Sequence, residues 1–78
     1  MGIKWKVSRK RDLVGKSYYC IVPEDSEGFD WTKTKVVAKD DDTANQEAEN
    51  VFLEWNMGNI FRKGDTLTLI NGKKVTRN

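Results

Sequence analysis

The stretch DDDTANQEAENVFLEW, residues 40–55, decides the fold because it predicts the helix on which the other elements must pack. Thr43 at the N-cap and Gln46 three residues later match a capping box, and the aspartates of residues 40–42 complement the positive end of the helix dipole. Gly58 stands where this helix would end. One apolar stripe follows at helical spacing: Ala44, Ala48, Val51, Phe52 and Trp55. We expect this stripe to pack on a sheet.

Three strands are expected before the helix. Residues 3–9 alternate, with Trp5 among the apolar positions and Lys4 and Lys6 among the polar ones, which is typical of a half-buried strand. Gly15 suits a turn into a second strand, residues 17–22, so the two form a hairpin. After a loop at residues 23–30, β-branched side chains predict a third strand at residues 31–39, with Lys33 and Lys35 on one side.

A second hairpin is expected after the helix. Residues 66–70 and 73–77 flank Asn71-Gly72, the favoured dipeptide of a type I′ turn. The predicted fold class is therefore α+β, an antiparallel sheet of four to five strands packed on one α-helix in the order β-β-β-α-β-β. All 78 residues are expected to form a single small domain.

The residue inventory argues against an enzyme. The chain has no histidine and one cysteine, Cys20, so Ser-His-Asp and Cys-His sites and the common zinc sites have no residues to form them. Cys20 lies within the second predicted strand, where a small buried hydrophobe is the expected role. Helix capping accounts for the aspartates of residues 40–42 better than metal chelation, because the spacing of a calcium loop is absent. We expect no catalytic residues, cofactor or metal.

The cellular location is also expected from composition. A single cysteine suits a reducing compartment, and no run of eighteen apolar residues occurs. The first residues lack the apolar run of a signal peptide. A cytoplasmic protein without membrane contact is expected.

Charge is strongly polarised although the net charge is only +2. The first sixteen residues are rich in lysine and arginine, whereas residues 40–54 carry six acidic residues and no basic one. If the helix covers one side of the sheet, the other side presents lysines with aromatic residues between them, as nucleic-acid surfaces require. The candidate contacts are Lys4, Lys6, Lys33, Lys35, Trp31, Arg9 and Arg11. The alternative is an ordinary solvated sheet, edged with lysine to block aggregation.

Residues 3–58 resemble the arm-type DNA-binding domain at the N-terminus of tyrosine recombinases. The resemblance rests on KSYYCIV at residues 16–22, TKVVAK at residues 34–39, and Ala44 and Ala48 leading to Glu54 and Trp55. In that family a three-stranded sheet backed by one helix enters the DNA major groove. The resemblance implies that Lys4, Lys6, Lys33 and Lys35 contact DNA, while the hairpin of residues 66–77 is an addition to the family pattern.

DTANQEA, residues 42–48, is also similar to the helix start of small bacteriophage proteins that disable host enzymes such as RNA polymerase. This resemblance implies a viral protein that binds a host protein through the acidic surface of residues 40–54 or through a free strand edge. The candidate contacts are then Asp41, Glu47, Glu49 and Glu54. We expect a small DNA-binding regulatory module, with a protein-binding inhibitor or modulator of a host enzyme as the alternative.

Overall fold

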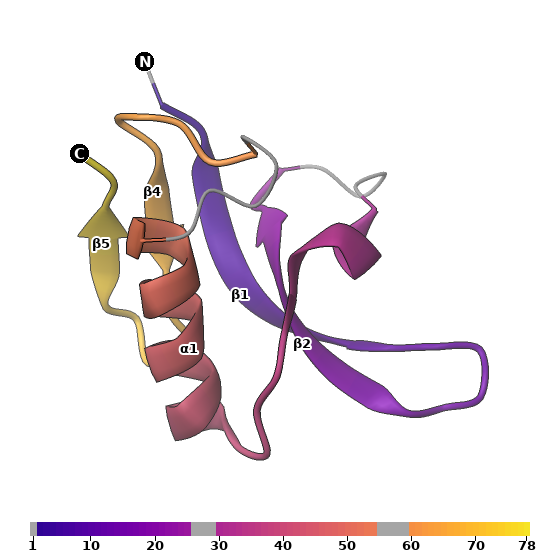
Figure 1. The fold of residues 1–78 in the computed structure, drawn as a ribbon. Helices are drawn as coiled ribbons and strands as arrows, with labels where there is room; N and C mark the ends of the chain where they lie inside the picture. Colours follow the sequence, from indigo (N-terminus) through magenta and orange to yellow (C-terminus); the bar gives the residue numbers. More distant parts are fainter. Residues whose placement is uncertain (1, 26–29, 55–59) are drawn as a thin grey trace.

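The computed structural model describes residues 2–25, 30–54 and 60–78. Along the chain the elements are β1 (Lys4–Arg11), β2 (Ser17–Pro23), the 3-10 helix η1 (Trp31–Thr34), β3 (Lys35–Val36), α1 (Asp41–Glu54), β4 (Thr66–Thr68) and β5 (Lys74–Thr76). The strands form one five-stranded sheet in the order β3-β2-β1-β4-β5, and α1 lies across one side of it (Figure 1). The predicted α+β class is confirmed.

The sheet is mixed rather than wholly antiparallel. β1 pairs antiparallel with β2, but β1 pairs parallel with β4. The chain leaves the sheet after β3, runs through α1 and returns on the other side of β1, so that β4 enters in the same direction as β1 (Figure 1). A helical crossover of this kind is the usual link into a parallel strand pair. The expectation of an antiparallel sheet was wrong at this pairing.

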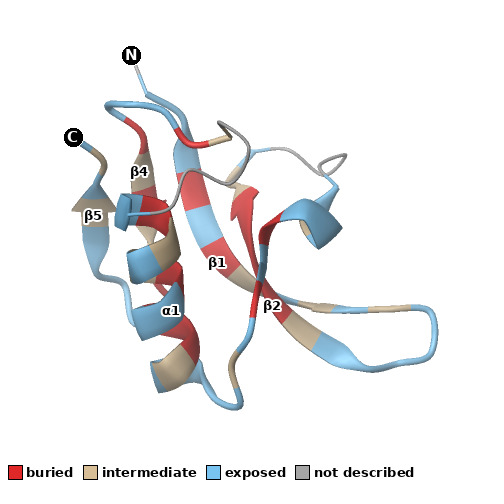
Figure 2. Cartoon of the chain, viewed as in Figure 1, coloured by how far each residue is buried: buried red, intermediate tan, exposed pale blue. Residues whose placement is uncertain are grey.

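The core lies between α1 and the sheet (Figure 2). Ala44, Ala48 and Phe52 of the predicted stripe are fully buried, while Val51 packs partly buried at its edge. Trp5 meets Phe61 edge-on with ring centroids 5.0 Å apart. The predicted roles of Trp55 and Gly58 fall outside the described residues. Burial of the stripe is what fixes α1 to this side of the sheet.

A cap at Thr43 would make Ala44 the first residue of helix α1, but the helix begins at Asp41, three residues earlier. The Asp40 carboxylate accepts a hydrogen bond from the backbone N–H of Thr43 at 2.8 Å, and the Asp40 carbonyl accepts from Ala44 N–H at 2.9 Å. Asp40 is therefore the capping residue, and the capping box of Thr43 and Gln46 was wrong. An aspartate is as good a cap as threonine or better, and the earlier start buries Ala44 within the first turns.

The expected third strand at residues 31–39 is mostly a short 3-10 helix. Asp30 accepts a hydrogen bond from the backbone N–H of Thr32 at 3.1 Å, a local side-chain bond that competes with extended backbone. Thr34 is buried and its hydroxyl donates to the Ile21 carbonyl, which holds η1 against β2. Only Lys35 and Val36 pair with β2 as a strand. The sequence predicted that Lys33 and Lys35 lie on one side of a single strand. That prediction was wrong, because Lys33 lies in η1 and only Lys35 lies in β3.

Both predicted hairpins are present, but neither uses a two-residue turn. In the second one, Leu69 N–H donates to the Lys73 carbonyl at 2.8 Å and Gly72 N–H donates to the Leu69 carbonyl at 3.0 Å. The loop therefore holds residues 70–72, with Gly72 at φ +91°, the three-residue arrangement rather than type I′. The predicted turn type was wrong, because Asn-Gly also suits a loop in which only the glycine is left-handed.

Candidate nucleic-acid interface

Lysines of β1 point away from α1. Side chains alternate across a strand, and Trp5 and Val7 of β1 are buried in the core beneath α1. Lys4, Lys6 and Lys10 therefore lie on the opposite side, where Lys4 and Lys6 are exposed. The prediction that the lysines of the early strands face away from the apolar stripe of α1 agrees with this geometry.

Pairing between strands adds lysines from the rest of the sheet to the same side. Lys6 is paired with Val22 of β2. Cys20 lies two positions before Val22 and so on the same side of the sheet, and it is paired with Lys35 of β3. On the other side of β1, Lys6 is paired with Thr68, which is paired with Lys74 of β5. Paired residues project to the same side of a sheet. We call this side the lysine face, and its cations are Lys4, Lys6, Lys10, Lys35 and Lys74.

Two aromatic rings lie at one end of the lysine face. Tyr18 of β2 and Trp31 of η1 have ring centroids 6.0 Å apart, and the Lys35 ammonium lies 4.0 Å from the Tyr18 centroid. The same ammonium is 5.6 Å from the Trp31 ring, and the Lys16 ammonium is 5.7 Å from Tyr18. Both rings are half-buried, so each retains surface open to solvent. We call Tyr18, Trp31 and Lys35 the aromatic cluster.

The Glu24 carboxylate reaches the lysine face. The Thr68 hydroxyl donates to Glu24 at 3.1 Å, and the backbone N–H of Glu24 donates to the Lys4 carbonyl at 2.9 Å. Within the described ranges the ion pairs are Arg9 with Asp41 and Lys73 with Glu49, and neither involves a lysine of this face. The lysines of this face thus form no ion pair within the described ranges, and together they outnumber Glu24 and create a positive potential.

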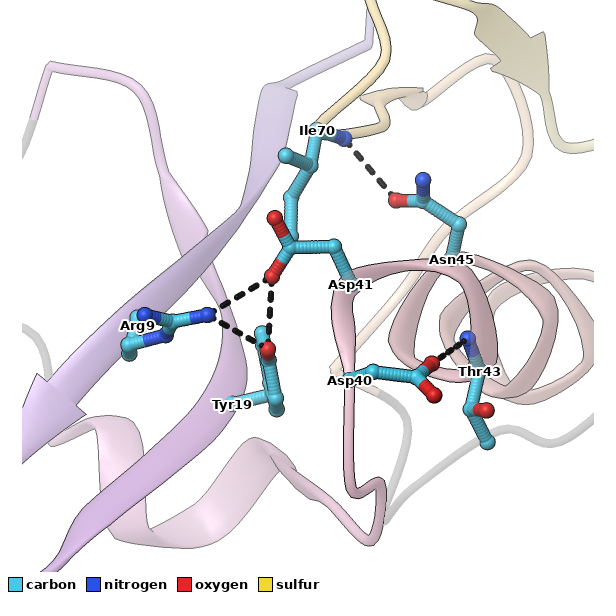
Figure 3. Close-up of polar contacts among 7 residues, drawn as sticks. All are labelled: Arg9, Tyr19, Asp40, Asp41, Thr43, Asn45 and Ile70. Carbon is cyan, nitrogen blue, oxygen red and sulfur yellow. Dashed lines mark hydrogen bonds and ion pairs between the residues drawn. The ribbon is translucent and has the colours of Figure 1, made fainter.

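Arg9, expected among the nucleic-acid contacts, lies on the other side of the sheet. Its guanidinium donates to Asp41 at 2.8 Å and to the Tyr19 hydroxyl at 2.7 Å, and that hydroxyl donates to Asp41 at 2.6 Å (Figure 3). The hydrogen bond with Asp41 raises the pKa of Tyr19, and the hydrogen bond with Tyr19 raises the pKa of Arg9. Arg9 joins β1 to the start of α1 and so contributes to the fold rather than to the lysine face. Arg11 shares the side of Arg9 by alternation.

The acidic residues gather on α1, on the other side of the sheet. Asp41, Glu47 and Glu54 are exposed on α1, and Glu49 forms an ion pair with Lys73 at 3.5 Å. A groove of about 370 Å³ runs between α1 and β3, lined by Glu47, Val51, Glu54, Val36 and Val37 among others. Helix α1 thus carries five acids and no base, and Arg9 and Lys73 form ion pairs with two of those acids.

Other site types find less support. Cys20 is fully buried, as expected, and burial raises the pKa of its thiol, which leaves it a poor nucleophile at neutral pH. Within residues 2–25, 30–54 and 60–78 there is no group of three or more acidic or cysteine side chains placed to hold a metal ion. No helix of the described part of the chain is long and apolar enough to cross a membrane.

Some residues of this site were missed in the sequence. Lys10 belongs to β1, which extends to Arg11 and not only to residue 9, and the alternation of KWKVSRKR already carried that signal. For the paired tyrosines the sequence indicated that one could join the lysines, and the pairing of Lys10 with Tyr18 selects Tyr18 over Tyr19. Lys74 had no local signal, because it joins the face through the parallel pairing of β1 with β4.

No family model matches the chain, and the curated proteins and solved structures likewise contain no significant match to it.

Proposed function

We propose that this protein is a small DNA-binding regulatory module that contacts the duplex with its lysine face. The observation that carries the proposal is the separation of charge: lysines from β1, β3 and β5 converge on the side of the sheet opposite α1, while α1 carries five acids and no base. Affinity for DNA comes largely from cations that displace condensed counterions from phosphates.

The geometry of the strands supports a duplex as the partner. A two-stranded ribbon can lie along a groove of the duplex. The β1–β2 hairpin is such a ribbon, and in Figure 1 it extends beyond the rest of the sheet. Lys6 and Lys10 on this ribbon, with Lys35 on the neighbouring strand, would then face phosphates on the groove walls.

The aromatic cluster supports contact with sugars and bases as well as phosphates. A ring that already holds a cation at 4.0 Å presents both an apolar surface and a positive charge. Such rings can pack on the sugars of a duplex and stack on bases wherever the strands are open. The cluster therefore favours a nucleic acid over a purely acidic protein as the partner of this side.

The salt dependence of binding tests the proposal. Lys6→Gln combined with Lys35→Gln removes two cations of the lysine face and leaves the core untouched. Because each phosphate contact contributes about 0.9 to the slope of log K against log salt, the double variant should lower the slope by about two and weaken binding at every salt concentration. The measurement is fluorescence anisotropy of a labelled duplex at several salt concentrations.

A matched control removes the same charge elsewhere. Lys73 lies beside Glu49 of α1 and Lys39 precedes that helix, so Lys39→Gln with Lys73→Gln should leave the slope close to that of the unmodified protein. Equal losses from both pairs would mean that net charge, not the lysine face, governs binding. Binding that does not weaken with added salt would remove the basis of the proposal.

A second candidate function rests on the groove between α1 and β3. β3 is an edge strand, Val37 beside it is 90% exposed, and Glu47 and Glu54 flank the groove. A host enzyme could add a strand or a basic segment there, as expected of a protein-binding modulator. Glu47→Lys with Glu54→Lys should then abolish recovery of a partner in a pull-down, whereas Asp42→Lys at the start of α1 should not.

A further inference from the structure

The tip of the β1–β2 hairpin carries two apolar side chains that the fold leaves in solvent. Leu13 is 106% exposed and Val14 is 85% exposed, more than the other large apolar residues of the described ranges except Val37. The hairpin projects from the body of the molecule, so its tip lies far from the core (Figure 2). These side chains do not stabilise the folded chain by burial, and adjacent apolar side chains in solvent can mark a contact surface.

Hydrogen bonds close the loop that presents these residues. One carboxylate oxygen of Asp12 accepts hydrogen bonds from the backbone N–H groups of Val14 at 3.0 Å and Lys16 at 2.9 Å. Gly15 closes the loop at φ +83°, and its N–H donates to the Asp12 carbonyl at 3.1 Å. Leu13 and Val14 are thus preorganised, and presenting them to a partner costs little additional order.

Cations surround the tip on both sides of the ribbon. Lys10 and Lys16 lie on the side of Tyr18, whereas Arg11 lies on the opposite side by alternation. Two apolar side chains are a small area for stable anchoring in a membrane. A DNA groove has phosphate walls on both sides, and proteins that enter the minor groove commonly insert apolar wedges between base pairs. The charge distribution around the tip therefore favours duplex DNA.

We infer that Leu13 and Val14 form a wedge that enters the minor groove of DNA, separates adjacent base pairs and bends the duplex. This inference rests on the proposed function and adds to it the deformation of the bound DNA. Leu13 and Val14 act as the wedge, while Lys10, Arg11 and Lys16 hold the ribbon between the phosphate walls. The lysine face supplies most of the binding, and the wedge supplies the bend.

Ligase-mediated cyclisation of a short duplex tests the wedge. A fragment of about 100 bp is shorter than the DNA persistence length of roughly 150 bp, so it closes slowly unless it is bent. The unmodified protein should raise the cyclisation rate by about tenfold or more, a scale set by the stiffness of the free fragment. Leu13→Ser with Val14→Ser should remove this acceleration and retain salt-dependent binding. Leu13→Met with Val14→Ile, which keeps an apolar tip, should preserve it.

The outcomes separate the wedge from the proposed function. If Leu13→Ser with Val14→Ser still accelerates cyclisation, the wedge is overturned while DNA binding stands. If the unmodified protein does not bind the duplex, the proposed function fails as well. Binding to vesicles of phosphatidylcholine and phosphatidylserine that is lost with the serine pair, without any acceleration of cyclisation, would assign the tip to a membrane instead. Both substitutions are at solvent-exposed positions, and an unchanged Tm shows that folding is not the cause.

Discussion

Asp65 is a carboxylate that the fold buries and surrounds with donors. It is 2% exposed, and it accepts hydrogen bonds from Ile3 N–H at 2.8 Å, Arg62 N–H at 2.9 Å and the Trp5 indole at 3.0 Å. Burial by itself raises the pKa of Asp65, but the hydrogen bonds from Arg62, Ile3 and Trp5 outweigh it and the pKa is lowered. This one side chain ties the start of β1 to the start of β4, the parallel pair that completes the sheet.

Asp65→Asn should therefore destabilise the protein. The amide keeps the size of the carboxylate but loses the charge and turns its own N–H₂ toward donors, so the free energy of unfolding should fall by about 2 kcal/mol at pH 7. The folded pKa lies below the ordinary value of 3.8, so the stabilisation is present above that pH and is lost as the pH falls through the folded pKa.

Urea unfolding of both proteins between pH 7 and pH 2.5 measures this effect. The difference in unfolding free energy should be constant down to about pH 5 and then shrink. Asp42→Asn, at an exposed position in the first turn of α1, is the control and should change little. A difference between Asp65→Asn and the unmodified protein that persists undiminished at the lowest pH would contradict the role of the ionised carboxylate.

At the scale of elements, hydrogen bonds near both ends of helix α1 hold it against the sheet. Asp40 caps its first turn, Asn45 accepts a hydrogen bond from Ile70 N–H at 2.9 Å, and Arg77 donates to the Phe52 carbonyl near its end (Figure 3 for the first two). The last two bonds come from the β4–β5 hairpin, so the hairpin and α1 support each other. The lysine face keeps its geometry because α1 cannot shift from the core side.

The cap can be assigned by mutation. Asp40→Ala should lower Tm by about 4 °C, because the backbone N–H of Thr43 in the first turn of α1 then loses its hydrogen-bond acceptor. The hydrogen bond from Thr43 N–H lowers the pKa of Asp40, so the loss should be greatest above that pKa. Thr43→Ala should lower Tm less. The reverse order in thermal denaturation would restore the capping box that the sequence predicted.

At the scale of the whole molecule, the opposed charges of the lysine face and of α1 should orient the protein on a polyanion. A net charge of +2 is modest, yet the lysine face presents its cations together. The acids of α1 would point away from the phosphates, so that they repel the DNA less than a random distribution would. Approach by the α1 side is disfavoured for the same reason.

Binding should be independent of pH around neutrality. Histidine is the side chain whose ordinary pKa places its charge change between pH 5.5 and 7, and the chain has none. We expect the dissociation constant for a duplex, measured by anisotropy at fixed ionic strength, to vary by less than about twofold over that interval. A steep change there would point to a titrating group that the lysine face does not contain.

The sequence by itself determined the α+β class, the amphipathic helix, both hairpins and the side of β1 on which Lys4 and Lys6 lie, because each depends on periodicity or turn chemistry within a few residues. Only the tertiary structure decided the parallel pairing of β1 with β4, the replacement of the third strand by η1 and the place of Lys74, because these depend on contacts between segments far apart in the chain. Arg9 illustrates the difference. Its charge can be read from the sequence, but its ion pair with Asp41 forms only because α1 packs beside β1.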